Sequence, residues 1–311
     1  MKEIAISYGT YFQYLRPTIK SLSIYNNEAQ ILNFNDGEIA VKFTDSVRGK
    51  HVFIFGDTTH NKTELEMTID AARRSSAGEI TVVLPYYGYA RQDKKGTDRA
   101  NIGASVIALI LQSLGVNRVV AIDLHADQIQ GNFQIPFEHI YGKNLFLDQA
   151  KAIMKKAPNE EWVLCSPDAG GVQRVKSFAK ALGMLHVIID KQRDKPGSIE
   201  SMQLIGDVKG KNVILIDDIV DTGGTLIKGN EYLKEMGAKS VYNIITHPVL
   251  SQNATEKIRE SKIHLITSNT RNSINVDNLP ENIQIIDCSD IIHQAILNIA
   301  QNKSIITTLT Q

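Results

Sequence analysis

Residues Val213–Thr225 read VILIDDIVDTGGT, and this stretch decides the fold of the chain. Its first four residues, Val213–Ile216, form a continuous apolar run, which is typical of a buried strand in a parallel sheet. The helix-like segment Leu226–Met236 follows directly. Open α/β sheets bind their ligands outside the carboxyl ends of such strands. The stretch therefore predicts a strand, a turn that binds a ligand, and a helix.

The turn between this strand and this helix has the residues of an anion-binding loop. Its glycines let the backbone approach a phosphate closely, and its threonine hydroxyls can donate hydrogen bonds. The helix that follows adds unpaired N–H groups and a partial positive charge. The predicted loop consists of Asp221, Thr222, Gly223, Gly224 and Thr225.

Two further carboxylates, Asp217 and Asp218, are expected just after the strand and suit sugar hydroxyls or a magnesium-bound polyol. An ordinary strand, turn and helix with acidic turn residues is the alternative. Three carboxylates at a buried strand end are costly to desolvate without a ligand, so we favour a binding site. The chain contains neither GxxxxGK[ST] nor GxGxxG, which excludes a Walker A loop and a dinucleotide fingerprint.

The composition is that of a globular protein of about two domains. The 311 residues include 34 Lys and Arg and 34 Asp and Glu, so overall charge gives no reason to expect nucleic acid or a membrane as a partner. We find no targeting segment and no membrane span, and we expect a cytoplasmic protein. Cys165 and Cys288 have no metal-binding spacing and are predicted to be buried, reduced thiols.

Apolar runs alternate with helix-like segments along the chain, which predicts an α/β fold with a mainly parallel sheet. The predicted strands are Val52–Phe55, Ile80–Leu84, Val119–Ile122, Trp162–Cys165, His186–Ile189, Val213–Ile216 and Val241–Ile245. The predicted helices are Glu64–Ser75, Ile102–Leu114, Gly171–Leu182 and Leu226–Met236.

An internal repeat indicates two copies of one α/β domain. Five residues recur at a constant spacing, and in both halves they mark a helix end, a glycine, a strand and a histidine. They are Leu111, Gly115, Val119, Ile122 and His125, matched by Leu233, Gly237, Val241, Ile244 and His247. We place the domain boundary near Gly142–Asp148, which gives an N-terminal domain of residues 1–145 and a C-terminal domain of residues 146–311.

Several motifs together resemble the ribose-phosphate pyrophosphokinase family, which is built from type I phosphoribosyltransferase-like domains. VILIDDIVDTGGT is similar to the ribose phosphate fingerprint of that family. The loop Pro85–Lys95, the segment Phe34–Glu38, and the blocks Asp123–Gly131 and Ser166–Gly171 match further family signatures. Taken alone, the loop Pro85–Lys95 could equally be a solvated charged loop beside core tyrosines.

The resemblance assigns roles to individual residues. It implies ATP contacts for Phe34, Asp36, Glu38, Arg91 and Gln92, the first three across a subunit interface. It implies magnesium ligation by His125 and Asp168, and carboxylates suit this hard cation. Ribose phosphate would bind to Asp217, Asp218 and the loop Asp221–Thr225.

The polar segment Asp190–Gly197 coincides with a mobile catalytic loop of the family, and Lys191 and Arg193 keep its two cations. Cations that close over a diphosphoryl group offset its developing negative charge and exclude water. With His125, these two residues are the expected catalytic residues.

The expected reaction transfers the diphosphoryl group of ATP to ribose 5-phosphate, giving AMP and 5-phosphoribosyl 1-pyrophosphate. Magnesium would be the cofactor, and family members are often hexamers or other homo-oligomers. The sequence departs from the family pattern in its N-terminal thirty residues, in a shortened Gly56–Lys62 segment and at Asn101. Three alternatives therefore stay open: a larger acceptor such as ADP-ribose, a phosphoribosyltransferase, and a non-catalytic regulatory homologue.

Overall fold

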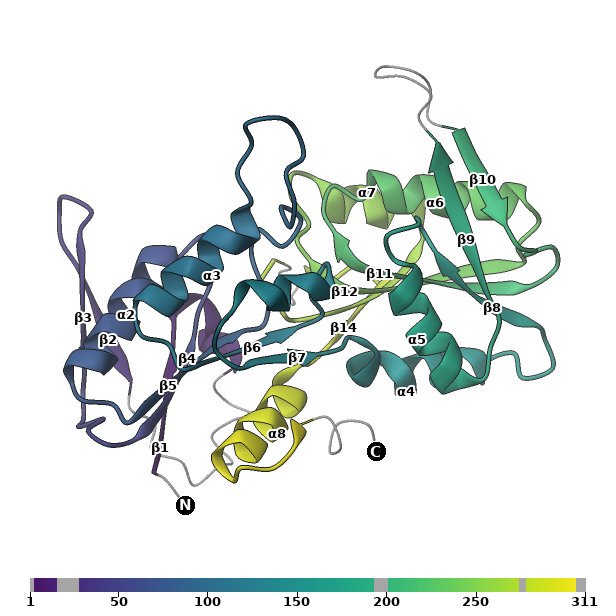
Figure 1. The fold of residues 1–311 in the computed structure, drawn as a ribbon. Helices are drawn as coiled ribbons and strands as arrows, with labels where there is room; N and C mark the ends of the chain where they lie inside the picture. The colour runs from purple at the N-terminus through teal and green to yellow at the C-terminus, as the bar shows by residue number, and fades with distance from the viewer. Residues whose placement is uncertain (1–2, 16–27, 193–200, 274–277, 306–311) are drawn as a thin grey trace. The chain divides into compact units, whose positions relative to one another are not determined.

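A computed structural model gives the fold and describes residues 3–15, 28–192, 201–273 and 278–305. The chain divides into two compact units. Figure 1 shows the fold, with the chain coloured by residue number. The first unit combines Met1–Tyr141 with Cys288–Gln311, and the second unit is Gly142–Asp287.

These units differ from the predicted domains 1–145 and 146–311 at both ends of the second unit. The predicted boundary lies inside helix α4 (Lys143–Met154), whose residues Phe146, Ala150 and Ile153 are buried in the core of the second unit. Helix α8 (Ser289–Ala300) groups with the first unit, although it comes last in the chain.

The first unit contains a five-stranded sheet in which every strand is parallel to its neighbours. Its order is β1-β4-β5-β6-β7. The strands are β1 (Ile4–Tyr8), β4 (His51–Phe55), β5 (Glu79–Leu84), β6 (Arg118–Ile122) and β7 (Phe137–Ile140). Short 3-10 helices lie at Thr10–Leu15 (η1) and Asp127–Asn132 (η2).

Both faces of this sheet are buried, which explains why its strands are continuous apolar runs and do not alternate with polar residues. Helices α2 (Lys62–Arg74) and α3 (Gly103–Ser113) share one core with residues of one face, including Val52, Ile54 and Val82. The residues that alternate with these along the strands, such as Phe53 and Val83, are buried on the other face. Figure 1 shows α8 across the sheet from α2 and α3.

The first unit also contains an antiparallel hairpin of β2 (Ala29–Asn33) and β3 (Ile39–Phe43). Most of its residues are partly or fully exposed, and β3 lies against helix α2. A two-stranded hairpin is only marginally stable in water, so this support from α2 is needed to order it.

The second unit is built on a seven-stranded sheet of order β10-β9-β8-β11-β12-β13-β14, in which only the edge strand β10 is antiparallel to its neighbour. The strands are β8 (Trp162–Ser166), β9 (His186–Gln192), β10 (Ser201–Ile205), β11 (Asn212–Val220), β12 (Ser240–Pro248), β13 (His264–Ser268) and β14 (Ile283–Ile286).

Helices cover both faces of the second sheet as well. Residues of α4 and α5 (Val172–Leu182) share a core with Leu164, Ile214 and Ile244, whereas residues of α6 (Gly224–Glu235) and α7 (Ala254–Ser261) share another with Val213 and Leu215. The predicted α/β fold with two mainly parallel sheets is therefore confirmed.

The internal repeat corresponds to two equivalent pieces of structure, β5-α3-β6 and β11-α6-β12. Each helix is followed by a glycine in the left-handed region, Gly115 at φ +90° and Gly237 at φ +92°. Glycine reaches this region without the steric cost that a Cβ imposes, so it ends each helix and turns the chain into the next strand.

Four predicted strand ends were too early, and β8 differs by the single residue Ser166. Strand β11 continues to Val220 and β12 to Pro248, and these two residues pair in register. Strand β9 continues to Gln192 and pairs with β10, so the segment from Asp190 begins as a hairpin arm. Polar residues mark the ends of buried strands in sequence patterns, but backbone pairing can continue beyond the last apolar residue.

The two thiols behave as predicted. Cys165 and Cys288 are fully buried and form no disulfide, and burial raises the pKa of the Cys165 thiol to about 12. Among the described helices, none is both long and apolar enough to cross a membrane.

Candidate active site

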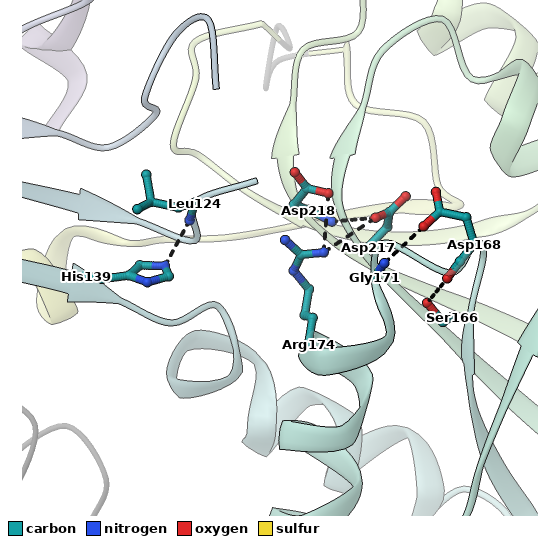
Figure 2. Close-up of polar contacts among 8 residues, drawn as sticks. All are labelled: Leu124, His139, Ser166, Asp168, Gly171, Arg174, Asp217 and Asp218. Carbon is teal, nitrogen blue, oxygen red and sulfur yellow. Dashed lines mark hydrogen bonds and ion pairs between the residues drawn. The ribbon is translucent and has the colours of Figure 1, made fainter. Parts of the chain in front are cut away.

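Two adjacent carboxylates at the end of β11 face one arginine. Asp217 and Asp218 lie within β11, where backbone pairing with β12 still holds Asp217 opposite Ile245. Nη1 of Arg174, in the first turn of α5, is 3.7 Å from Oδ1 of Asp217 and 3.4 Å from Oδ1 of Asp218. Figure 2 shows the guanidinium group directed at both carboxylates.

The two carboxylates differ in exposure and therefore in the contacts they can make. The Asp218 side chain is 4% exposed, whereas that of Asp217 is 19% exposed. Oδ1 of Asp217 also accepts a hydrogen bond of 2.9 Å from the backbone N–H of Asp218. Of the two, Asp217 can therefore contact a ligand more readily.

Charge is concentrated at this strand end. Burial raises the pKa of Asp217 well above its usual value, and the neighbouring carboxylates of Asp218 and Asp168 raise it further, whereas Arg174 acts in the opposite direction. A carboxylate whose pKa is strongly raised by burial and by neighbouring carboxylates is typical of a functional site.

The predicted phosphate loop lies between β11 and α6. Gly223 has φ +78° and is the N-cap residue of α6, which begins at Gly224, earlier than the predicted Leu226. Thr222 and Thr225 are exposed. The loop thus combines a left-handed glycine, exposed hydroxyl side chains and the amino end of a helix, which are the features that bind phosphate.

Asp221, the first residue of this loop, is fixed by a neighbouring segment. Its Oδ1 accepts a hydrogen bond of 2.5 Å from Oγ of Ser251, which follows β12. Sequence reasoning did not identify Ser251, because it lies 30 residues away in the chain.

Asp168 follows β8, the strand beside β11, and stands in a tight turn (Figure 2). Its Oδ1 accepts a hydrogen bond of 3.0 Å from the N–H of Gly171, and its carbonyl oxygen accepts one of 2.7 Å from Oγ of Ser166. The described residues contain no group of three or more His, Cys, Asp or Glu side chains that could hold a metal. The Asp168 carboxylate is itself a hard oxygen donor of the kind that magnesium takes, together with waters and substrate phosphates.

In the first unit, the predicted residue His125 is exposed and follows β6 in a constrained turn. Asp123 has φ +41°, an uncommon value for a residue with a Cβ. The N–H of Leu124 donates a hydrogen bond of 2.9 Å to Nε2 of His139 on β7 (Figure 2). The neighbouring strand thus fixes the peptide that precedes His125.

The predicted ATP residues Arg91 and Gln92 are exposed in the loop after β5. Oε1 of Gln92 accepts a hydrogen bond of 3.0 Å from Nδ2 of Asn101, and a Cβ on Gly103 would lie 2.6 Å from the same oxygen. A side chain at position 103 would therefore force the Gln92 amide to shift from its place at the start of α3.

The other predicted ATP residues, Phe34, Asp36 and Glu38, form the exposed tip of the β2-β3 hairpin. The Phe34 side chain is 54% exposed. The tip is held by hydrogen bonds within itself, from the N–H of Phe34 to the carbonyl of Glu38 at 2.9 Å and from the N–H of Glu38 to Oδ1 of Asp36 at 3.1 Å.

The two predicted catalytic cations, Lys191 and Arg193, follow the apolar part of β9. Lys191 lies in β9, in register with Met202 of β10, so its backbone belongs to a hairpin arm. Arg193 lies outside the described residues.

Arg174 is a second residue of this site that sequence reasoning missed. A signal existed: two adjacent buried carboxylates require a cation nearby, and β8 with its following helix is the neighbour of β11 in the sheet. Arg174 is the first cation after the Ser166–Gly171 block.

Comparison with known proteins gives matches to both halves of the chain. Residues 6–115 match the family model described as the N-terminal domain of ribose phosphate pyrophosphokinase, and residues 144–281 match the phosphoribosyl transferase domain model. A ribose-phosphate pyrophosphokinase from Campylobacter jejuni is 44% identical over 298 residues, which cover 94% of this chain and 94% of the relative.

A second ribose-phosphate pyrophosphokinase, from Porphyromonas gingivalis, is 41% identical over 308 residues, which cover 96% of this chain and 95% of the relative. Among solved structures, the phosphoribosylpyrophosphate synthetase from Mycobacterium smegmatis is similar with a TM-score of 0.87 and 34% sequence identity. That match covers 97% of this chain and 100% of the other.

Proposed function

This chain belongs to the ribose-phosphate pyrophosphokinase family, and we propose that it transfers the β,γ-diphosphoryl group of ATP to the 1-hydroxyl of ribose 5-phosphate. The products are AMP and 5-phosphoribosyl 1-pyrophosphate. One observation carries this proposal: the likeness extends over both domains, including the pyrophosphokinase N-terminal domain at residues 6–115. A phosphoribosyltransferase would need only the second domain.

The sugar phosphate binds in the second unit. Its 5-phosphate lies on the loop Asp221–Thr225, where Gly223 and the start of α6 provide N–H donors and positive potential. Asp217, which is more exposed than Asp218, accepts hydrogen bonds from the ring hydroxyls.

ATP and magnesium are the proposed co-substrate and cofactor. Phe34, Asp36, Glu38, Arg91 and Gln92 would bind the nucleotide, and His125 and Asp168 would hold the metal. When bound, magnesium would neutralise part of the charge of the phosphates. The side chains orient the nucleotide and keep its β-phosphorus in line with the acceptor hydroxyl.

In the reaction, the 1-oxygen of the sugar forms a bond to the β-phosphorus as the bond from that phosphorus to the α,β-bridging oxygen breaks. Lys191 and Arg193 offset the negative charge that develops on the moving group. No covalent enzyme intermediate is involved. Presence of both cations argues against a non-catalytic homologue.

The active form is a cytoplasmic homo-oligomer in this proposal, a hexamer or another assembly of dimers. The exposed apolar residues support this: Phe34 at the hairpin tip is 54% exposed, and Val106 and Leu109 on the outer side of α3 are 46% and 65% exposed. In an assembly, the hairpin tip of one subunit completes the ATP site of its neighbour.

Phosphorus NMR of a mixture of ATP, ribose 5-phosphate, magnesium and enzyme tests the reaction. Attack on the β-phosphorus releases one AMP for each 5-phosphoribosyl 1-pyrophosphate formed. Stoichiometric ADP in place of AMP would contradict the proposal, because it requires attack on the γ-phosphorus.

A separate measurement tests the acceptor. We expect kcat/KM to favour ribose 5-phosphate over ADP-ribose, because the site elements match the smaller sugar phosphate. A preference for ADP-ribose of about tenfold or more, equivalent to about 1.4 kcal/mol, would replace the acceptor and leave the diphosphoryl chemistry intact.

A further inference from the structure

The contact between Arg174 and the two carboxylates of β11 gives Arg174 a role in the sugar site. Its Nη1 atom approaches both, at 3.7 Å from Asp217 and 3.4 Å from Asp218. Both distances exceed the 2.7–3.2 Å of a direct N–H···O hydrogen bond. The guanidinium group therefore faces both carboxylates at ion-pair distance and acts on the pair through its charge.

This cation is held in place. Its side chain is only 12% exposed, and it stands in the first turn of α5, whose residues Val175 and Phe178 are buried in the core of the second unit. Arginine stays charged in proteins, so the site has a fixed positive charge. Charges so close together, with Asp218 buried and Asp217 partly buried, are costly unless the three groups compensate one another.

Without this charge, the two neighbouring carboxylates would repel each other in a poorly solvated site. Asp218, which is 3% exposed, has little room to turn toward solvent. Asp217 is the partner that can move, and it is also the partner proposed to meet the ring hydroxyls. The position of Asp217 therefore depends on Arg174.

We propose that Arg174 is a positioning residue for ribose 5-phosphate: its guanidinium group holds the Asp217–Asp218 pair so that Asp217 faces the ring hydroxyls of the sugar. This inference rests on the proposed function. Arg174 acts on the sugar alone, so its loss weakens sugar binding and leaves the ATP site unchanged.

The test compares Arg174→Gln and Arg174→Lys with the wild-type protein. Arg174→Gln should raise KM for ribose 5-phosphate about tenfold or more and leave KM for ATP within about threefold. Lysine restores a single positive charge, so Arg174→Lys should recover a substantial part of the sugar affinity. Calorimetric titration of ribose 5-phosphate into each protein gives the same comparison without turnover.

The matched control is Arg259→Gln on α7, where an exposed arginine pairs with Glu256. It should change neither KM. A purely structural role for Arg174 predicts a lower melting temperature with sugar and ATP affinities reduced alike, or no rescue by lysine. Either result would overturn the inference, as would an unchanged sugar KM in Arg174→Gln.

A double-mutant cycle with Asp218→Asn covers the case in which Arg174→Gln is unstable. If Arg174 acts through the pair, removing one carboxylate should relieve much of the loss, and the two effects should not add. Additive effects would count against the inference. AMP release by the wild-type and Arg259→Gln proteins reports separately on the proposed function, so a failure of one proposal is distinguishable from a failure of the other.

Discussion

Nε2 of His139 accepts a hydrogen bond from the backbone N–H of Leu124, with 2.9 Å between the two nitrogen atoms. A ring nitrogen can accept only when it carries no proton, so the proton of the neutral ring lies on Nδ1. Nδ1 is 3.4 Å from Oδ1 of Asp127, a carboxylate that favours this tautomer. The ring thus connects β7 to the turn that presents His125.

Replacing His139 should release this turn. His139→Leu leaves the buried N–H of Leu124 without its acceptor, which costs about 1–3 kcal/mol. Exchange of the Leu124 amide hydrogen should accelerate by about one to two powers of ten, since 1.4 kcal/mol is a factor of ten. His293→Gln, in α8, is the control. Unchanged exchange at Leu124 would show that His139 does not hold the turn.

The catalytic and binding assignments in the second unit predict different kinetic defects. Lys191→Ala should lower kcat about a hundredfold or more with little change in KM for the sugar, because it removes charge that acts on the transition state. Asp221→Ala should mainly raise KM for the sugar, because Asp221 and Ser251 hold the loop. Lys228→Ala, an exposed residue of α6, is the control. If Lys191→Ala mainly raised KM and Asp221→Ala mainly lowered kcat, both assignments would be wrong.

The charge of Asp217, which the site needs for sugar binding, should lower the folding stability of the ligand-free protein. Burial and the carboxylates of Asp218 and Asp168 disfavour its charged form. Asp217→Asn removes this charge and should raise the melting temperature of the ligand-free protein while weakening sugar binding. A lower melting temperature would mean that Arg174 more than compensates for the repulsion.

The increase in melting temperature expected for Asp217→Asn should grow as pH rises. The pKa of Asp217 is raised in the folded protein, so the protonated form of Asp217 favours folding. This stabilisation is fully present below the unfolded pKa of about 3.9 and is lost as pH rises through the folded pKa. The melting temperatures of wild type and Asp217→Asn should therefore be closest at low pH and should separate as pH increases. Thermal melts across this range test the direction.

The hairpin tip predicts complementation between inactive subunits. If Asp36 serves the ATP site of a neighbour, Asp36→Ala and Lys191→Ala proteins should restore activity when mixed and allowed to exchange subunits. About a quarter of wild-type activity is expected for equal amounts, because an intact site needs an unaltered residue from each of two subunits. Recovery should be absent if each site is formed by one chain.

Much of this architecture could be predicted because its signals are local. Apolar runs such as Val82–Leu84 identify buried strands, and Gly223 with Gly224 marks a turn that only glycine permits easily. Strand ends were harder to predict. Asp217 and Asp218 interrupt the apolar run, yet β11 continues to Val220 because its backbone pairs with β12.

The remaining features depend on contacts between distant segments. Arg174 and Asp218 are brought together by the order of strands in the sheet, which no local pattern records. Ser251 reaches Asp221 for the same reason. Grouping of α8 with the first unit also escapes sequence reasoning, because an apolar helix face does not specify which sheet it covers.

The first unit is interrupted by the second, and this has a consequence for synthesis on the ribosome. Strand β1 is translated before the second unit, whereas α8, which groups with the same unit as β1, is translated only after Asp287. The inserted unit, residues 142–287, is complete at that point. Domains usually fold in the order in which they emerge. Here the inserted unit can finish folding before α8 is made, so the apolar face that α8 covers stays exposed on the first unit until then.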